Sequence, residues 1–180
     1  KDGRVIYEKS WGHPMYNDSV EVTGNSIYDL ASVTKIAATT LAVMKLYDQG
    51  LIRLTDPLGK HLPMARGTDK ASLSIGSIMA HEAGLQDWIP FFKETLRNGQ
   101  PDPALYGSER SDQFPVQVCD SLFMSPTGRN MILKQILESP VAPDKKYRYS
   151  DLGFYLLREM VEEMTGKTFE SYLNETCYRP

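Results

Sequence analysis

The sequence has little of what marks several broad classes of protein. Its 180 residues include only two cysteines, Cys119 and Cys177, too few and too far apart for a disulfide framework or a cysteine-based metal site. We expect both to be buried thiols. No apolar run reaches the ~18 residues of a membrane-spanning helix. Lys and Arg number 20 against 23 Asp and Glu, and they form no cluster, which argues against nucleic acid or an anionic membrane as partner.

An initiating methionine, a signal peptide and internal repeats are also missing from the sequence. The chain begins Lys1-Asp2-Gly3-Arg4, and this Asp-Gly pair predicts a hairpin turn that leads into a strand over residues 5–11. Natural proteins rarely begin inside a hairpin, so we expect the N-terminus to have been trimmed. The length suits one domain, or part of a larger one.

Most of the remaining pattern predicts helices. Apolar residues at helical spacing predict a largely buried helix over residues 32–49, ended by Gly50. Between residues 88 and 128, five prolines break any period, and we expect a functional loop or a family insertion there. Further helices are predicted by the same spacing over residues 74–80, 129–138, 150–165 and 169–177.

Ser32 and Lys35 open the longest of these helical stretches. Residues three apart share a helix face, so the amine can reach the hydroxyl. Serine needs a neighbouring base to become a nucleophile, and lysine serves as that base once its pKa is lowered. Lys35 as a merely solvated helix residue is the alternative.

The Ser-x-x-Lys pair is one of several motifs that follow a strand-turn-strand entry in a characteristic order. The motifs are residues 28–35 (YDLASVTK), 50–57 (GLIRLTDP), 74–85 (SIGSIMAHEAGL) and 147–154 (YRYSDLGF). Together they resemble the class C β-lactamase and penicillin-binding-protein-like serine hydrolases, a family that includes D-alanyl-D-alanine peptidases and esterases. The resemblance covers almost the whole chain outside residues 88–128.

The resemblance implies a role for four residues. Ser32 is the acylated nucleophile, Lys35 its proton partner, and Tyr149 the tyrosine of the family's Tyr-x-Asn motif. Asp151 stands at the Asn position of that motif as a substrate-binding residue. A carboxylate only accepts hydrogen bonds, and it can hold Lys35 charged and so weaken it as a base. The alternatives are that Tyr149 only packs in the core, and that Asp151 is only an acidic residue favoured at a helix N-terminus by the helix dipole.

A second departure from the family concerns its Lys/His-Thr/Ser-Gly strand, which does not occur after Ser150. We therefore expect residues 1–180 to be a truncated domain without the C-terminal strands and third motif. The implied fold is an α/β sandwich with a helical subdomain, β-lactamase/transpeptidase-like. This part of it is expected to be mostly α with an N-terminal β-hairpin.

The implied function is serine hydrolysis through an acyl-enzyme, on D-amino-acid peptides, β-lactams or small esters, without cofactor or metal. Whether the chain alone turns over substrate stays open. The resemblance also implies a bacterial, extracytoplasmic protein, periplasmic or secreted, in which other domains can flank this one. The alternative function is a non-catalytic module that binds peptidoglycan-like ligands or serves as an accessory domain.

Two further sets of residues are expected to have roles other than catalysis. His81 is expected to be structural, bracing the turn at Gly84, because the matching histidine of the family is structural. Trp88, Phe91 and Phe92 either line a substrate cleft or fill core, since apolar pockets and cores share their composition.

Overall fold

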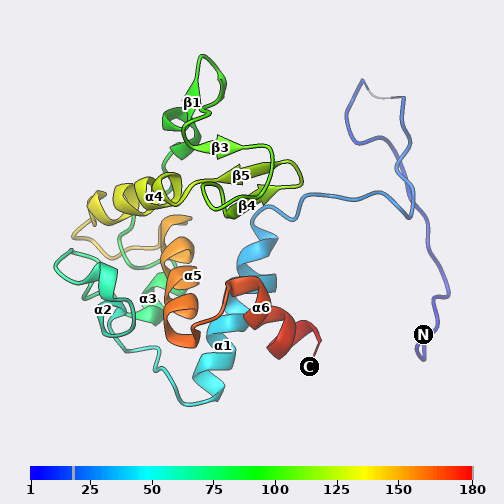
Figure 1. The fold of residues 1–180 in the computed structure, drawn as a ribbon. Helices are drawn as coiled ribbons and strands as arrows, with labels where there is room; N and C mark the ends of the chain where they lie inside the picture. Colours follow the sequence, from blue (N-terminus) through cyan, green and yellow to red (C-terminus); the bar gives the residue numbers. More distant parts are fainter. Residues whose placement is uncertain (18, 180) are drawn as a thin grey trace. The chain divides into compact units, whose positions relative to one another are not determined.

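The computed structural model describes residues 1–17 and 19–179 (Figure 1). The chain divides into two compact units, Lys1–Thr34 and Lys35–Pro180. We call them the N-terminal unit and the main unit. All named helices and strands among the described residues belong to the main unit.

The N-terminal unit consists of turns and extended chain. The expected β-hairpin is wrong, because residues 5–11 carry no strand assignment. A backbone bond from Val22 N–H to the Gly12 carbonyl (2.9 Å) closes a loop instead. The apolar side chains of the expected strand are largely exposed, with Val5 at 79% and Tyr7 at 74%. A two-stranded hairpin is marginal without a further strand or helix to cover it, so an Asp-Gly turn followed by β-forming residues was not enough to predict one.

Helices make up most of the main unit. Their bounds are η1 Lys35–Thr40 (a π-helix), α1 Leu41–Asp48, α2 Leu58–His61, η2 Pro63–Ala65, α3 Ile75–Met79, η3 Phe91–Glu94, α4 Pro126–Glu138, α5 Leu152–Thr165, α6 Phe169–Leu173 and η4 Asn174–Tyr178.

The predicted helix ends are confirmed where a specific end residue marked them. Gly50 follows α1 with φ +71°, and Gly166 ends α5 with φ +65°, the left-handed conformation that glycine adopts without a steric penalty. Ser74 caps α3 by accepting a hydrogen bond from Ser77 N–H. Helix α4 begins three residues before the expected start, because Ser125 caps it and Pro126 occupies its first position.

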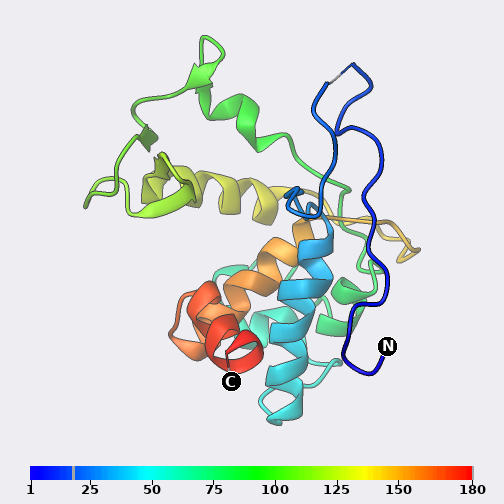
Figure 2. The same cartoon turned by 90° about the vertical axis from the view of Figure 1, so that its right-hand side faces the viewer.

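Helix α5 lies at the centre of the main unit, where it contacts α1, α2, α3 and α6 (Figures 1 and 2). The side chains of Leu152, Leu156, Leu157 and Met160 are completely buried there. At Gly153 the helix passes so close to α3 that an added Cβ would lie 2.5 Å from Ile78 Cγ2. Removal of this apolar surface from water is the main source of stability of the unit.

Two small antiparallel sheets form within residues 88–128. One pairs β1 (Leu96–Arg97) with β2 (Gln100–Pro101), and the other has the order β3 (Tyr106–Gly107), β5 (Leu122–Met124), β4 (Val116–Cys119). Figures 1 and 2 show this strand-bearing part (green) at the edge of the main unit, beside α4. The expected burial of Cys119 is wrong, because the residue is exposed on β4.

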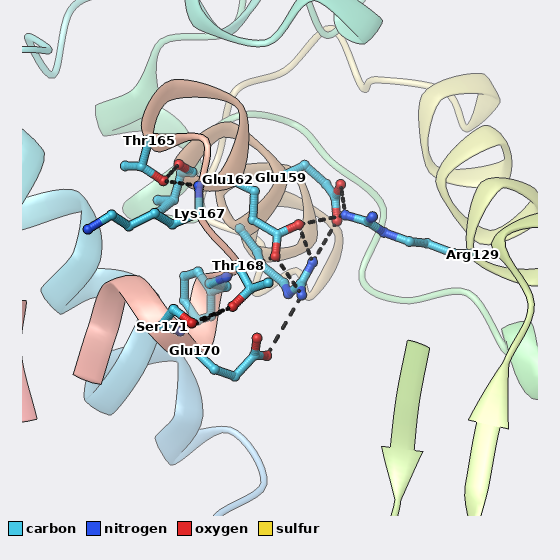
Figure 3. Close-up of polar contacts among 11 residues, drawn as sticks. Arg129, Glu159, Glu162, Thr165, Lys167, Thr168, Glu170 and Ser171 are labelled. Carbon is cyan, nitrogen blue, oxygen red and sulfur yellow. Dashed lines mark hydrogen bonds and ion pairs between the residues drawn. The ribbon is translucent and has the colours of Figure 1, made fainter. Parts of the chain in front are cut away.

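A network of ion pairs joins α4, α5 and the start of α6 (Figure 3). Arg129 of α4 lies 2.5 Å from Glu159 and 2.7 Å from Glu162 of α5. Arg158 pairs with the same two glutamates, and Glu162 also accepts a bond from Phe169 N–H (2.9 Å). Because Glu159 is buried, these arginines supply the partners that its carboxylate requires.

In the described part of the chain, no helix combines the length and apolar character needed to cross a bilayer.

Candidate active site

Lys35 lies where η1 begins, with its side chain only 15% exposed. Its Nζ is 2.6 Å from Oδ1 of Asp151. The same Nζ lies 5.0 Å from the ring centroid of Tyr149 and 5.8 Å from that of Phe154. Three of the four residues proposed from sequence, Lys35, Tyr149 and Asp151, therefore share one cluster, although the first is far from the other two in sequence.

The charge of Lys35 follows from these neighbours. Burial alone would lower the pKa of the Lys35 amine. Hydrogen bonding and Coulomb attraction from Asp151 and from Tyr149 act the other way, and together they raise this pKa above its ordinary value. The lysine is thus an ammonium ion at neutral pH and must lose a proton before it can accept one.

Asp151 is the N-cap residue of α5, but its carboxylate makes no capping bond to the helix. Ser150 Oγ accepts the hydrogen bond from Leu152 N–H instead (3.2 Å). The Asp151 side chain turns to Lys35, and its Oδ1 is buried while the side chain as a whole stays 38% exposed. Its main contact is therefore the ion pair. This argues against the alternative that Asp151 serves only as an acidic residue interacting with the dipole of α5.

The chain just before α5 is held by the turn that follows α3. Arg148 N–H donates to the carbonyl of His81 (2.8 Å), and Asp151 N–H donates to the carbonyl of Asp87 (2.8 Å). Between these two bonds, Ser150 N–H donates to Nδ1 of His81 (3.1 Å). Since both ends of this short stretch are fixed by backbone groups, the side chains on it have a defined direction.

His81 braces this stretch rather than serving as a base. Its ring stacks at 4.5 Å on Tyr149 and at 5.3 Å on Phe154. Burial and the nearby Lys35 charge lower the pKa of the imidazole, so the ring is neutral at pH 7. Because Nδ1 accepts the bond from Ser150 N–H, the proton resides on Nε2.

Ser32 lies in the N-terminal unit, in a tight turn that runs into the helix, and it is exposed. Asp29 Oδ1 accepts a bond from Ala31 N–H (2.8 Å), and Ala31 itself has φ +43°. The turn is closed by Val33 N–H, which donates to the Leu30 carbonyl (2.8 Å). A non-glycine residue at positive φ is uncommon, and such residues tend to occur at functional sites.

A pocket of about 350 Å³ opens beside Asp151. Trp88, Phe91 and Phe92 all line it. This favours the interpretation that these aromatic side chains line a cleft over the alternative that they fill the core. Tyr106 and Tyr155 complete the aromatic wall. Tyr106 could not be predicted from sequence pattern, because the β3 strand that carries it is only two residues long.

Metal-binding groups do not gather at this site. Over residues 1–17 and 19–179, no set of three or more His, Cys, Asp or Glu side chains is arranged to hold an ion.

The comparison with protein families decides the classification. A family model described as Beta-lactamase matches residues 1–180. The chain belongs to the beta-lactamase family. The family covers the helical unit together with the turn that contains Ser32.

The curated relatives of this beta-lactamase-family chain include bacterial proteins named D-alanyl-D-alanine carboxypeptidase. The one from Escherichia coli (strain K12) is 29% identical over 196 residues, which is 100% of this chain and 39% of the relative. One from Salmonella schwarzengrund is 29% identical over 198 residues, or 100% of this chain and 40% of the relative. The chain therefore spans about two fifths of the length of these relatives.

Solved structures share the fold. FmtA from Staphylococcus aureus superposes with a TM-score of 0.53 at 22% identity, covering 83% of this chain and 33% of FmtA. A structure titled SurE gives a TM-score of 0.54 at 21% identity, with 83% and 26% covered. The expected β-lactamase/transpeptidase-like fold, mostly helical in this part, is thus confirmed, apart from the N-terminal hairpin.

Proposed function

We propose that this chain carries the nucleophile and proton-transfer groups of a serine hydrolase that works through an acyl-enzyme. Ser32 attacks a carbonyl carbon, Lys35 and Tyr149 transfer protons, and Asp151 contacts substrate. Water then releases the acyl group. The substrates proposed are D-amino-acid peptides, β-lactams or small esters, in line with the names of the relatives.

The observation that carries the proposal is the Lys35 cluster. A half-buried amine 2.6 Å from a carboxylate and 5.0 Å from a tyrosine ring has the groups that general acid–base catalysis needs. This amine also lies three residues after Ser32 on the entry to a helix. A serine hydroxyl requires such a base, and the phenol of Tyr149 is a second proton carrier beside it.

The proton steps balance as follows. Neutral Lys35 or ionised Tyr149 takes the Ser32 hydroxyl proton as the oxygen bonds to the carbonyl carbon. The same proton then passes to the leaving amine or alcohol as its bond to carbon breaks. Asp151 stabilises the ammonium form of Lys35, so it favours the enzyme after proton uptake and opposes the initial deprotonation.

The proposal extends to the whole protein. Because the chain spans 39% of the length of a relative, we propose that the domain is completed by further strands that carry the third motif and a second oxyanion donor. An extracytoplasmic location, periplasmic or secreted, belongs to the same proposal.

A covalent probe tests the proposal directly. A fluorescent penicillin and a fluorophosphonate are to be added to the full-length protein and to its Ser32→Ala variant. Labelling of the wild type that disappears in Ser32→Ala supports the acyl-enzyme. Turnover of p-nitrophenyl esters without a penicillin adduct identifies an esterase.

The second candidate function is a non-catalytic module that binds peptidoglycan-like ligands. It is favoured by the raised pKa of Lys35, which makes this amine a weak base at neutral pH. Absence of labelling by both probes on a folded full-length protein, together with binding of a peptidoglycan fragment, supports this candidate and overturns the first.

A further inference from the structure

The aromatic pocket next to Lys35 ends at a carboxylate. Trp88, Phe91 and Phe92 come from the turn and short helix that precede β1, and Tyr155 from α5, while Asp151 supplies the anionic group. The pocket, at about 350 Å³, lies within the ~300–1,000 Å³ range of small-molecule sites. A ligand group that enters it meets aromatic side chains and a carboxylate whose other partner is the Lys35 ammonium.

Asp151 divides its two oxygens between two environments. Oδ1 is buried at 2.6 Å from Lys35 Nζ. Oδ2 accepts no hydrogen bond from the described residues, and the side chain is 38% exposed. Oδ2 is therefore the oxygen available to a ligand in the pocket. An asparagine would present no formal charge there.

The aromatic wall is already assembled. Phe91 meets Tyr155 edge-on, with ring centroids 5.8 Å apart at 87°. Burial raises the pKa of the Tyr155 hydroxyl, and the nearby Asp151 charge raises it further, so this ring stays a neutral phenol. Trp88 and Phe92 remain more than half exposed at the mouth. Faces of neutral aromatic rings attract cations, and tryptophan does so most strongly.

We infer that this pocket selects ligands that carry an ammonium group, held between the aromatic faces and Oδ2 of Asp151. Resting on the proposed function, this narrows the substrate class to esters or amides with a positively charged nitrogen near the scissile carbonyl. A neutral group of the same shape gains the apolar contact but neither the Coulomb attraction to Asp151 nor the cation–π interaction.

Binding of a cation and of its neutral isostere tests the inference without any need for turnover. Choline and its carbon isostere dimethylbutanol are titrated into the full-length protein and into its Trp88→Phe variant, and the difference between the two fluorescence signals follows Trp88. We expect choline to quench Trp88 saturably and the isostere to bind about tenfold more weakly. Equal affinity for both, or no saturable quenching by choline, overturns the inference.

Variants locate the effect. Asp151→Asn is expected to weaken choline binding about tenfold while leaving the isostere unchanged. Phe92→Leu keeps apolar bulk but removes a ring, so it weakens choline selectively. Asp87→Asn is the matched control, because Asp87 is an exposed carboxylate that pairs with Arg148 (3.6 Å) and does not line the pocket. A loss in Asp87→Asn as large as that in Asp151→Asn contradicts the assignment.

The Ser32→Ala variant separates this inference from the proposed function. Choline binding that is equal in wild type and Ser32→Ala, when no covalent probe labels the wild type, keeps the pocket assignment and removes only the hydrolase. The opposite result is a protein that the probes label but that hydrolyses an alanine p-nitroanilide no faster than its N-acetyl form. This result keeps the hydrolase and removes the pocket assignment.

Discussion

At the scale of single residues, the substitution of Asp for Asn at position 151 has the largest chemical consequence. An amide at this position can donate one hydrogen bond and accept another without changing the charge of Lys35. The carboxylate instead forms a 2.6 Å ion pair with this amine. One oxygen thus favours the charged form of the candidate base, and Asp151 also lines the aromatic pocket.

Asp151→Asn is expected to move the reaction of Ser32 to lower pH. Loss of the carboxylate removes a group that raises the Lys35 pKa, so this pKa falls. If neutral Lys35 is the base, labelling by the fluorophosphonate becomes faster at neutral pH. The measurement is the labelling rate of the full-length protein from neutral to alkaline pH, with Asp87→Asn as control. An unchanged profile, or a shift to higher pH, contradicts Lys35 as the base.

Asp56 forms a second charged cluster, outside the candidate site. Its Oδ2 lies 2.8 Å from His61 Nε2, accepts a bond from Lys60 Nζ (2.9 Å) and accepts another from Arg53 N–H (3.0 Å). These hydrogen bonds, that of His61 foremost, hold the pKa of the Asp56 carboxyl well below its ordinary value. A lowered carboxyl pKa stabilises the folded state above the unfolded value of ~3.9, and this contribution is lost as the pH falls through the folded value.

Asp56→Asn is therefore expected to destabilise the protein most at neutral pH. The difference in the free energy of unfolding between wild type and variant should shrink as the pH falls below about 4. Urea denaturation at neutral and acidic pH measures it. Asp48→Asn serves as control, since the Asp48 side chain is 76% exposed, and a pH dependence as large in Asp48→Asn argues against the cluster.

At the scale of elements, the close approach of α3 and α5 sets the frame of the site. Helix α3 leads into the turn that holds the chain before α5, and Gly153 permits the contact with Ile78. The position of Asp151 at the start of α5 therefore depends on a contact that tolerates no side chain two residues later.

Gly153→Ala is expected to lower the free energy of unfolding by about 1 kcal/mol. Overpacking costs about 1–3 kcal/mol, and the higher helix propensity of alanine offsets up to about 1 kcal/mol. Chemical denaturation of the single variants and of the double variant Ile78→Ala/Gly153→Ala measures the coupling. If the clash is real, the added methyl costs less once Ile78 Cγ2 is gone, and strict additivity argues against it.

How far sequence predicts these elements depends on their length. Helix α5 repeats its apolar period over several turns and ends at a left-handed glycine, so its pattern is unambiguous. The strands β1 to β3 contain two residues each, too few for alternation to be seen. Residues 5–11 show the opposite error, because they contain β-forming residues after an Asp-Gly turn but pair with no strand among the described residues.

The sequence predicted which residues form the candidate site better than it predicted how their side chains are arranged. Lys35, Tyr149 and Asp151 followed from ordered motifs, since no local spacing links position 35 to positions 149 and 151. That Asp151 both pairs with Lys35 and lines a pocket depends on side-chain packing. Sequence pattern does not encode such packing locally.

At the scale of the whole molecule, the ion pairs of Figure 3 connect helices that also share the hydrophobic core. Arg129 reaches from α4 to two glutamates of α5, and Arg158 extends the chain of contacts to Glu170 of α6 (3.8 Å). Buried pairs of this kind cost a desolvation penalty that only full pairing offsets. Removal of one member should therefore be felt across all three helices.

Glu159→Gln is expected to cost about 1.5–3 kcal/mol of unfolding free energy, because its carboxylate accepts charged hydrogen bonds from Arg129 and Arg158. Glu138→Gln, which breaks an exposed pair with Lys134 (3.7 Å), should cost no more than about 0.5 kcal/mol. Urea denaturation compares the two. Equal effects would mean that the network adds nothing beyond a surface pair.

The π-helical turn Lys35–Thr40 has a consequence for how this protein can change by insertion or deletion. A π turn accommodates roughly one residue more than an α turn, and each residue of an α-helix advances the chain by about 100°. Loss of a single codon between positions 36 and 40 could thus rewind the turn into regular α-helix with α1 left in place. Lys35 would then rotate about a quarter of a circle away from Asp151. A one-residue deletion here would therefore break the ion pair between Lys35 and Asp151 while leaving every buried side chain of α1 in place.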